Sequence, residues 1–184
     1  LIQLEIGVQS TNDATITEIH RTMQLDRLKA VVRSIQEKEN IHEHLDLIAG
    51  LPYEGYETFA RSFDEIYALK PIQLGFLKVL KGSYMYEHAT EYGLIYRSRP
   101  PYEVLKTNWL GFGEILRIRQ VEEMLEVYYN SGQYATAIRL LETQYASAFA
   151  MFAELGTLWG ARLFWNGSFQ DAQGGDPAGI CKRA

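Results

Sequence analysis

Cysteine is almost absent from this sequence, whose 184 residues include one, Cys181. A single thiol cannot close an intrachain disulfide, and an iron–sulfur cluster needs several thiolate ligands. We therefore exclude a disulfide framework, and we exclude any cysteine-only metal or iron–sulfur site built within this chain alone.

Long apolar runs are lacking as well. No stretch of the sequence reaches the roughly 20 apolar residues that a membrane-spanning helix needs. A charged-then-apolar leader of the secretory kind is not visible either. We expect a cytoplasmic protein of a reducing compartment, without a membrane partner.

Basic residues are outnumbered, since 18 Lys and Arg stand against 23 Asp and Glu, with a formal net charge of −5 and a pI near 5.4. Bulk positive charge drives non-specific contact with nucleic acid. We therefore expect no nucleic-acid partner held in that way, while a local basic patch stays open. Hydrophobic residues make up 47% of the chain, which is enough to bury a real core.

Strand and helix patterns alternate over the first 80 residues. The strand patterns cover residues 1–8, 42–49 and 72–80, and the helix patterns cover residues 25–39 and 56–69. Alternation at this spacing predicts parallel strands joined by right-handed crossovers. The first strand pattern starts at Leu1 with no cap or turn before it. We expect the chain to be cut from a longer polypeptide, a processed N-terminus being the alternative.

Side-chain parity along the strands predicts their architecture. In the second strand Leu45, Leu47 and Ala49 share one face, whereas His44 and Asp46 share the other. The first strand also has one apolar and one polar face, and the third is less clear. A sheet covered by helices on both faces should be apolar throughout. We therefore predict an α/β fold class, a fragment of a partial (β/α) barrel with about three parallel strands, helices on one side and a polar interior.

The pattern changes after residue 83. Arg99, Pro100 and Pro101 form the strongest helix breaker and the best internal boundary. Helices are predicted over residues 102–111, 114–129, 134–145 and 147–165. We predict a barrel fragment over residues 1–83, an all-helical C-terminal domain over 84–165, and a disordered tail or cloning remnant over 166–184.

Two polar residues at strand positions are candidates for ligand binding. Gln9 follows a strand and a glycine, Gly7, that would let a ligand approach the backbone, although a plain strand-ending turn is the alternative. Asp46 lies inside a strand, where an acid needs a partner or water. A ligand hydroxyl and a salt bridge to an Arg or Lys both fit Asp46. His42 and His44 have a chelating spacing but lack an evident third ligand, so we predict no metal site.

A helical hairpin pattern follows in the C-terminal part. The spacing of Tyr129, Gly132, Tyr134, Ala137 and Ile138 is that of one helix–turn–helix unit of the tetratricopeptide kind. A stable stack needs about three such units, so an ordinary helical hairpin is favoured. The corresponding alternative function is a helical scaffold or partner-binding module without a catalytic role.

Three elements at fixed spacing resemble a known family. They are residues 5–10 (EIGVQS), Arg21 twelve residues after Gln9, and residues 46–52 (DLIAGLP), with Asp46 twenty-five residues after Arg21. With these elements, residues 1–83 resemble the second half of a radical S-adenosylmethionine (SAM) domain, close to the oxygen-independent coproporphyrinogen oxidases and the methylthiotransferases. Later segments, residues 76–83, 100–105 and 128–132, resemble the uncharacterised C-terminal domain of some cobalamin-binding radical SAM proteins.

The resemblance implies a partial (β/α)6 barrel that holds a [4Fe–4S] cluster, SAM and a substrate in its lumen. It implies that Gln9 and Asp46 bind the SAM ribose or nearby polar groups, that Arg21 pairs with the methionyl carboxylate, and that the Ile48 backbone lies against the adenine. The family's G-x-I-x-G-x-x-E pattern is altered here, with Asp46 at its first glycine and Tyr53 at its glutamate. The cluster-binding C-x-x-x-C-x-x-C loop is absent from this sequence.

The resemblance also implies partners. The parent protein would be a radical SAM iron–sulfur oxidoreductase, and the N-terminal half of the same polypeptide would supply the cluster. A cobalamin domain would lie upstream, and the substrate is unknown. This chain alone would be inactive. Because an incomplete barrel leaves the edge of its first strand unpaired, we expect the isolated fragment to dimerise or exchange strands.

Overall fold

Three parallel strands form the main sheet of the protein. The computed structural model describes residues 2–38, 41–69, 71–165 and 180–181. Its strands β1 (Ile2–Gln9), β2 (Ile41–Ala49) and β3 (Ile72–Phe76) lie in that order, and both neighbouring pairs are parallel. The predicted set of three parallel strands is therefore confirmed.

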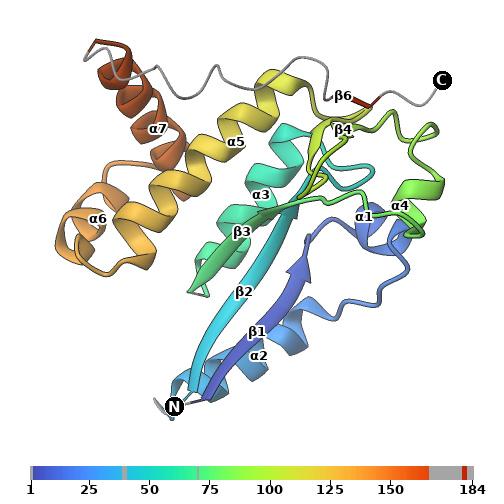
Figure 1. Cartoon of the computed structure of the whole chain (residues 1–184). Helices are drawn as coiled ribbons and strands as arrows, with labels where there is room; N and C mark the ends of the chain where they lie inside the picture. The colour runs from blue at the N-terminus through green and yellow to red at the C-terminus, as the bar shows by residue number, and fades with distance from the viewer. Residues whose placement is uncertain (1, 39–40, 70, 166–179, 182–184) are drawn as a thin grey trace.

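Helices cover one face of this sheet. The short helix α1 (Asp13–Glu18) and α2 (Leu25–Gln36) connect β1 to β2, and α3 (Tyr56–Tyr67) connects β2 to β3. Figure 1 shows α2 behind β1 and β2. The side chains of α3 that face the sheet recur at a helical spacing and are fully buried; they are Phe59, Phe63 and Ile66.

The two faces of the sheet differ as the alternation of residues predicts. On β2, Leu45, Leu47 and Ala49 are fully buried under the helices. His44, Asp46 and Ile48 point to the other face and are half-buried, and the neighbouring strands add exposed polar residues there, namely Gln3, Glu5 and Gln73. In the described part of the chain this second face stays open to solvent. We call it the open face.

A second, antiparallel sheet was not predicted. Strands β4 (Ile95–Arg97) and β5 (Val104–Lys106) form a hairpin, and β6 (Ile180–Cys181) pairs with the other edge of β4. The helix expected over residues 102–111 is therefore wrong, as is an all-helical structure beyond residue 83. Strands of three residues are too short to show a clear alternation of polar and apolar positions.

The proline pair lies in the turn of that hairpin. The Pro100–Pro101 peptide bond is cis, and the strands on either side of it are paired with each other. The two prolines are thus a turn within a hairpin rather than a linker between two domains. The strand β3 ends at Phe76 instead of Leu80. The Leu77 N–H still donates to the Ala49 carbonyl of β2, and the chain then turns toward the hairpin. The backbone of residues 77–79 pairs with residues 102–104.

The remaining helices occupy most of the predicted positions. After the one-turn helix α4 (Tyr84–Glu87) and the hairpin come α5 (Phe112–Met124), the π-helix η1 (Leu125–Asn130), α6 (Ala135–Glu142) and α7 (Ala148–Trp165). Helix α5 runs beside β3, where the Arg119 guanidinium lies 4.3 Å from the centre of the Phe76 ring. These helices confirm the helical C-terminal part of the predicted fold class.

One hydrophobic core joins both parts of the chain. Phe63 of α3 contacts Phe149 and Phe152 of α7, with ring centroids 5.5 and 6.1 Å apart. No helix in the described ranges is long and apolar enough to span a membrane. The division at residues 83 and 84 stays a prediction. Apart from Ile180 and Cys181, the tail expected over residues 166–184 lies outside the described residues.

Candidate functional site

Gln9 ends β1 in an unusual backbone conformation. Its φ angle is +70°, and the register with β2 shifts between Gly7 and Gln9. A bulge of this kind redirects the side chains around it. The Gln9 side chain lies over Gly7, because a Cβ added to Gly7 would be 2.5 Å from Gln9 Nε2. Glycine at position 7 thus leaves the room that the Gln9 amide occupies.

Arg21 reaches the same glycine from the connection between β1 and β2. Its Nη1 atom donates a hydrogen bond of 2.7 Å to the Gly7 carbonyl oxygen. A guanidinium carries five N–H donors, so most of its hydrogen-bonding capacity is left for a ligand. Arg21 is exposed, and it forms no ion pair with an acidic side chain among the described residues.

The backbone of Arg21 is fixed by the end of α1. The Arg21 N–H donates to the Ile16 carbonyl, at 3.0 Å, and the His20 N–H donates to the Thr17 carbonyl, at 3.1 Å. His20 has a φ of +56°. This pair of bonds around a left-handed residue is a Schellman motif, which commonly ends helices. The motif sets where the Arg21 side chain starts.

Asp46 lies beside Gly7 on the neighbouring strand. The two residues are paired in the β1–β2 register, and both belong to the open face. Asp46 Oδ1 is buried without a hydrogen-bond partner among the described residues. Burial raises the pKa of Asp46, the Glu5 carboxylate raises this pKa further, and His44 partly offsets the rise. Among the described residues no Arg or Lys forms the salt bridge considered for Asp46, and its Oδ1 atom can accept a ligand hydroxyl.

The open face continues along β2 on both sides of Asp46. Ile48 lies two residues further, half-buried and paired in register with Gly75 of β3. Towards the start of the strand, the rings of His42 and His44 are 4.8 Å apart, and His44 is paired with Glu5. Within the described ranges, no group of three or more His, Cys, Asp or Glu residues could hold a metal ion.

The structure therefore brings Gln9, Arg21 and Asp46 together around Gly7. Ile48 lies on the same face, one alternation along β2. An amide, a guanidinium and a carboxylate offer both donors and acceptors at one place. Their individual roles stay predictions.

Glu54 is a buried carboxyl group that the sequence interpretation missed. Its side chain is fully buried, and its Oε1 atom accepts hydrogen bonds from the Ser10 hydroxyl, at 2.6 Å, and the Ser62 hydroxyl, at 3.0 Å. Burial raises the pKa of Glu54 to about 7, against the opposing effect of these two bonds. Glu54 thus ties the residue after Gln9 to α3. The available signal was an acid one position after Tyr53, which stands at the family's glutamate.

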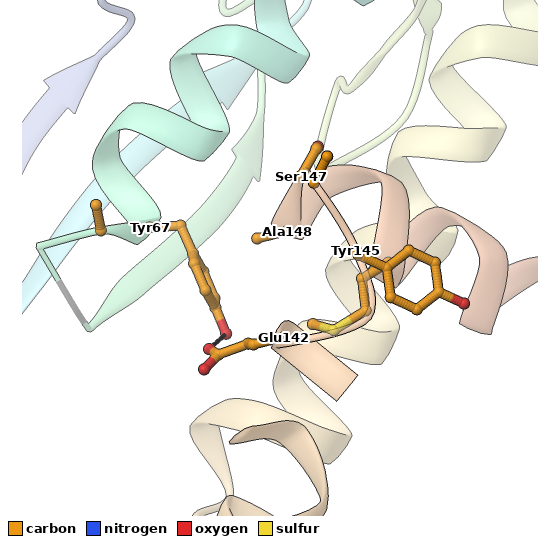
Figure 2. Close-up of a pocket in the computed structure, with 8 residues that line it drawn as sticks. Tyr67, Glu142, Tyr145, Ser147 and Ala148 are labelled. Carbon is orange, nitrogen blue, oxygen red and sulfur yellow. Dashed lines mark hydrogen bonds between the residues drawn. The ribbon is translucent and has the colours of Figure 1, made fainter. Parts of the chain in front are cut away.

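A cavity of about 320 Å³ lies elsewhere, where α3 ends and α7 begins. In Figure 2 the side chains of Tyr67 and Glu142 point toward each other, and the Tyr145 ring points away from them. The Tyr67 hydroxyl donates to Glu142 Oε1 at 2.6 Å, and burial together with this carboxylate raises the pKa of Tyr67. None of the residues that line this cavity belongs to the group around Gly7, and none is basic.

A family profile matches the C-terminal part of the chain. The profile of a family described as a protein of unknown function (DUF4080) matches residues 90–173, less than half of the chain. The matched segment includes the β4–β5 hairpin and helices α5, α6 and α7. No curated protein matches the chain.

Proposed function

We propose that this chain is the SAM-binding second half of a radical SAM enzyme and that SAM lies on its open face. One observation carries the proposal. Gln9, Arg21 and Asp46 come from a strand end, a connecting segment and a second strand, and all three lie at Gly7. The resemblance of the sequence to radical SAM domains rests on these same three residues.

Each residue has a chemical task in this proposal. Arg21 pairs with the methionyl carboxylate, because a guanidinium forms bidentate, charge-assisted hydrogen bonds with a carboxylate. Asp46, with its unpaired Oδ1, accepts hydrogen bonds from the ribose hydroxyls. The Gln9 amide binds polar groups nearby. The backbone of Ile48 lies against the adenine, beside Gly75, which has no side chain to obstruct a flat ring.

The iron–sulfur cluster does not fit this chain by itself. Three thiolates are needed for a radical SAM cluster, and the sequence contains one cysteine. We therefore assign the cluster, and the chemistry of SAM cleavage that it supplies, to the N-terminal half of the same polypeptide. A cobalamin domain upstream is part of the same proposal. The residues described here would bind and orient SAM and leave the chain alone inactive.

The helical scaffold is the less favoured function. In the described part of the chain one helical hairpin is present, in which η1 and α6 are joined through a turn at Gly132 with a φ of +70°. Ile138 of α6 is buried against the common core rather than against a further repeat. A scaffold function also leaves the meeting of Gln9, Arg21 and Asp46 unexplained.

Ligand titration of the whole chain tests the proposal. S-adenosylhomocysteine carries the methionyl-type carboxylate, and 5′-methylthioadenosine lacks it. We expect Arg21→Ala to weaken binding of S-adenosylhomocysteine by about 1.5–3 kcal/mol, the scale of a hydrogen bond to a charged group. Binding of 5′-methylthioadenosine should not change. NMR titration measures both affinities, including weak ones.

The matched control is Arg33→Ala, which removes an exposed guanidinium from the last turn of α2. Neither affinity should change in this variant. If Arg21→Ala weakened the binding of both ligands equally, or of neither, the contact between Arg21 and the ligand carboxylate would be ruled out. Failure of the wild-type chain to bind S-adenosylhomocysteine at millimolar concentration would remove the proposed function.

A further inference from the structure

Two tyrosine side chains from separate segments meet at Glu18, the last residue of α1. The Tyr92 hydroxyl donates a hydrogen bond to Glu18 Oε1. The Tyr84 hydroxyl, from α4, donates to the same oxygen at 3.3 Å, and the two tyrosine hydroxyl oxygens lie 3.2 Å apart. Neither the sequence motifs nor the proposed SAM contacts include these residues.

The cluster is anchored in the interior. Tyr92 is 1% exposed, and burial together with its bonds to Glu18 and Tyr84 raises the pKa of the Tyr92 hydroxyl. The hydroxyl therefore stays protonated and remains a donor near neutral pH. The Tyr84 ring also contacts His20, with ring centroids 4.9 Å apart in an edge-on arrangement. Both tyrosines thus hold the end of α1.

This end of α1 is the segment that carries Arg21. Glu18 and His20 lie just before Arg21, and the Schellman motif joins the Arg21 N–H to the Ile16 carbonyl. A turn locked by backbone bonds moves as a unit. Fixing the Glu18 carboxylate and the His20 ring therefore fixes the starting point and direction of the Arg21 side chain, whose guanidinium bonds Gly7.

Two residue choices in this segment are locally unfavourable. An acid in the last turn of a helix meets the partial negative charge of the free carbonyls. A histidine at a φ of +56° occupies a region that glycine adopts at lower cost. Nothing within α1 accounts for Glu18 or His20 at these positions. The hydrogen bonds to Tyr84 and Tyr92 account for Glu18, and the ring contact with Tyr84 accounts for His20.

We infer that Tyr92, together with Tyr84, is a positioning residue that holds Arg21 in place for the carboxylate of the ligand. The inference rests on the proposed function. Tyr92 belongs to the segment matched by the family of unknown function, residues 90–173. A part of the chain outside the radical SAM-like elements thereby contributes to the ligand site, acting through Glu18 and Arg21.

Two ligands and a double-mutant cycle in the whole chain test this inference. We expect Tyr92→Phe to weaken S-adenosylhomocysteine binding roughly tenfold, since it removes a hydrogen bond to a charged group. It should leave 5′-methylthioadenosine affinity within about twofold of wild type, because that ligand has no carboxylate for Arg21 to bind. In an Arg21→Ala background, Tyr92→Phe should change neither affinity. The control Tyr128→Phe removes the hydroxyl group of a half-buried tyrosine on η1 and should have no effect.

A ligand-free readout separates this inference from the proposed function. In ¹⁵N-arginine NMR spectra, we expect the Arg21 side-chain signals of Tyr92→Phe to shift toward those of a freely rotating guanidinium. Unchanged Arg21 signals overturn the inference, whether or not S-adenosylhomocysteine binds. Binding that depends on Arg21 but not on Tyr92 overturns the inference and leaves the proposed function intact. If Tyr92→Phe does not fold, Glu18→Ala replaces it, because alanine removes the acceptor of both tyrosine hydroxyls, with the same ligands and outcomes.

Discussion

Glu54 lies in the loop between β2 and α3, but its carboxyl group is buried like that of a core residue. It is fully buried, and two serine hydroxyls are bonded to one of its oxygens. Burial raises the pKa of Glu54 from 4.5 to about 7. The folded chain therefore holds the Glu54 proton more tightly than the unfolded chain does. Ionisation of this one residue should make stability depend on pH.

The sign of that dependence follows from the two pKa values. Between about pH 4.5 and pH 7 the folded state keeps a proton that the unfolded state has released, so stability falls as the pH rises. The free energy of unfolding of the wild-type chain should fall by about 3 kcal/mol between pH 4.5 and pH 8 because of Glu54. Glu54→Gln stays neutral and can still accept from Ser10, so this fall should be absent from the variant. Urea unfolding at several pH values measures the difference between the two proteins.

The control for this comparison is Glu57→Gln, an exposed carboxyl in the first turn of α3. Its pH profile should follow that of the wild-type chain. Parallel profiles for wild type and Glu54→Gln would show that Glu54 ionises normally in the folded protein.

Single residues were predictable where type and spacing carry the information. Asp46 was identified because it is an acid inside a strand. Gln9 was identified because it ends a strand shortly after a glycine. The structure places both residues at Gly7. Glu54 and Tyr92 were not predicted. Their contacts come from segments distant in sequence, Ser10 for Glu54 and Glu18 for Tyr92. A single sequence does not show such contacts.

Helices α5 and α7 approach each other closely at a glycine. A Cβ added to Gly156 of α7 would lie 2.8 Å from Gln120 Cβ and 3.4 Å from its backbone. Overpacking of this kind costs about 1–3 kcal/mol, more than the 0.5–1 kcal/mol or so that alanine gains over glycine in a helix. We expect Gly156→Ala to lower the free energy of unfolding, as measured by denaturant titration.

Gly113 of α5 is the matched position, because nothing lies within 4 Å of a Cβ added there. Gly113→Ala should leave the stability unchanged or raise it by up to about 1 kcal/mol. If both substitutions had the same effect, the close contact between α5 and α7 would be wrong.

Elements with many regularly spaced apolar residues were predicted well. The predicted bounds of α2, α3 and α7 are close to the observed ones, because their apolar residues recur at the helical spacing over several turns. The β4–β5 hairpin was missed, since its strands have three residues each. The helix predicted over residues 114–129 covers most of η1, but its π-helical geometry was not predicted, because its sequence continues the apolar spacing of α5.

At the scale of the whole molecule, β1 is an edge of the parallel sheet. In the described part of the chain it pairs with β2 alone, and Ile2 is 60% exposed. Unpaired edges are templates for another strand. We expect the isolated chain to dimerise or exchange strands through β1 and Ile2→Lys to shift it toward the monomer, because lysine on an edge opposes pairing. Light scattering coupled to size-exclusion chromatography measures the oligomeric state of the wild type and of the variant. A wild-type chain that stays strictly monomeric at high concentration would contradict pairing through the β1 edge.

The central claim is that the open face around Gly7 binds SAM, and chemical-shift mapping tests it most directly. The ¹⁵N-labelled chain is saturated with S-adenosylhomocysteine, and the amide signals are followed residue by residue. The account predicts the largest changes at Gly7, Gln9, Asp46 and Ile48, with the Arg21 side chain shifting in step. Changes confined to the cavity beside Tyr67 and Glu142, or no changes near Gly7, would contradict it.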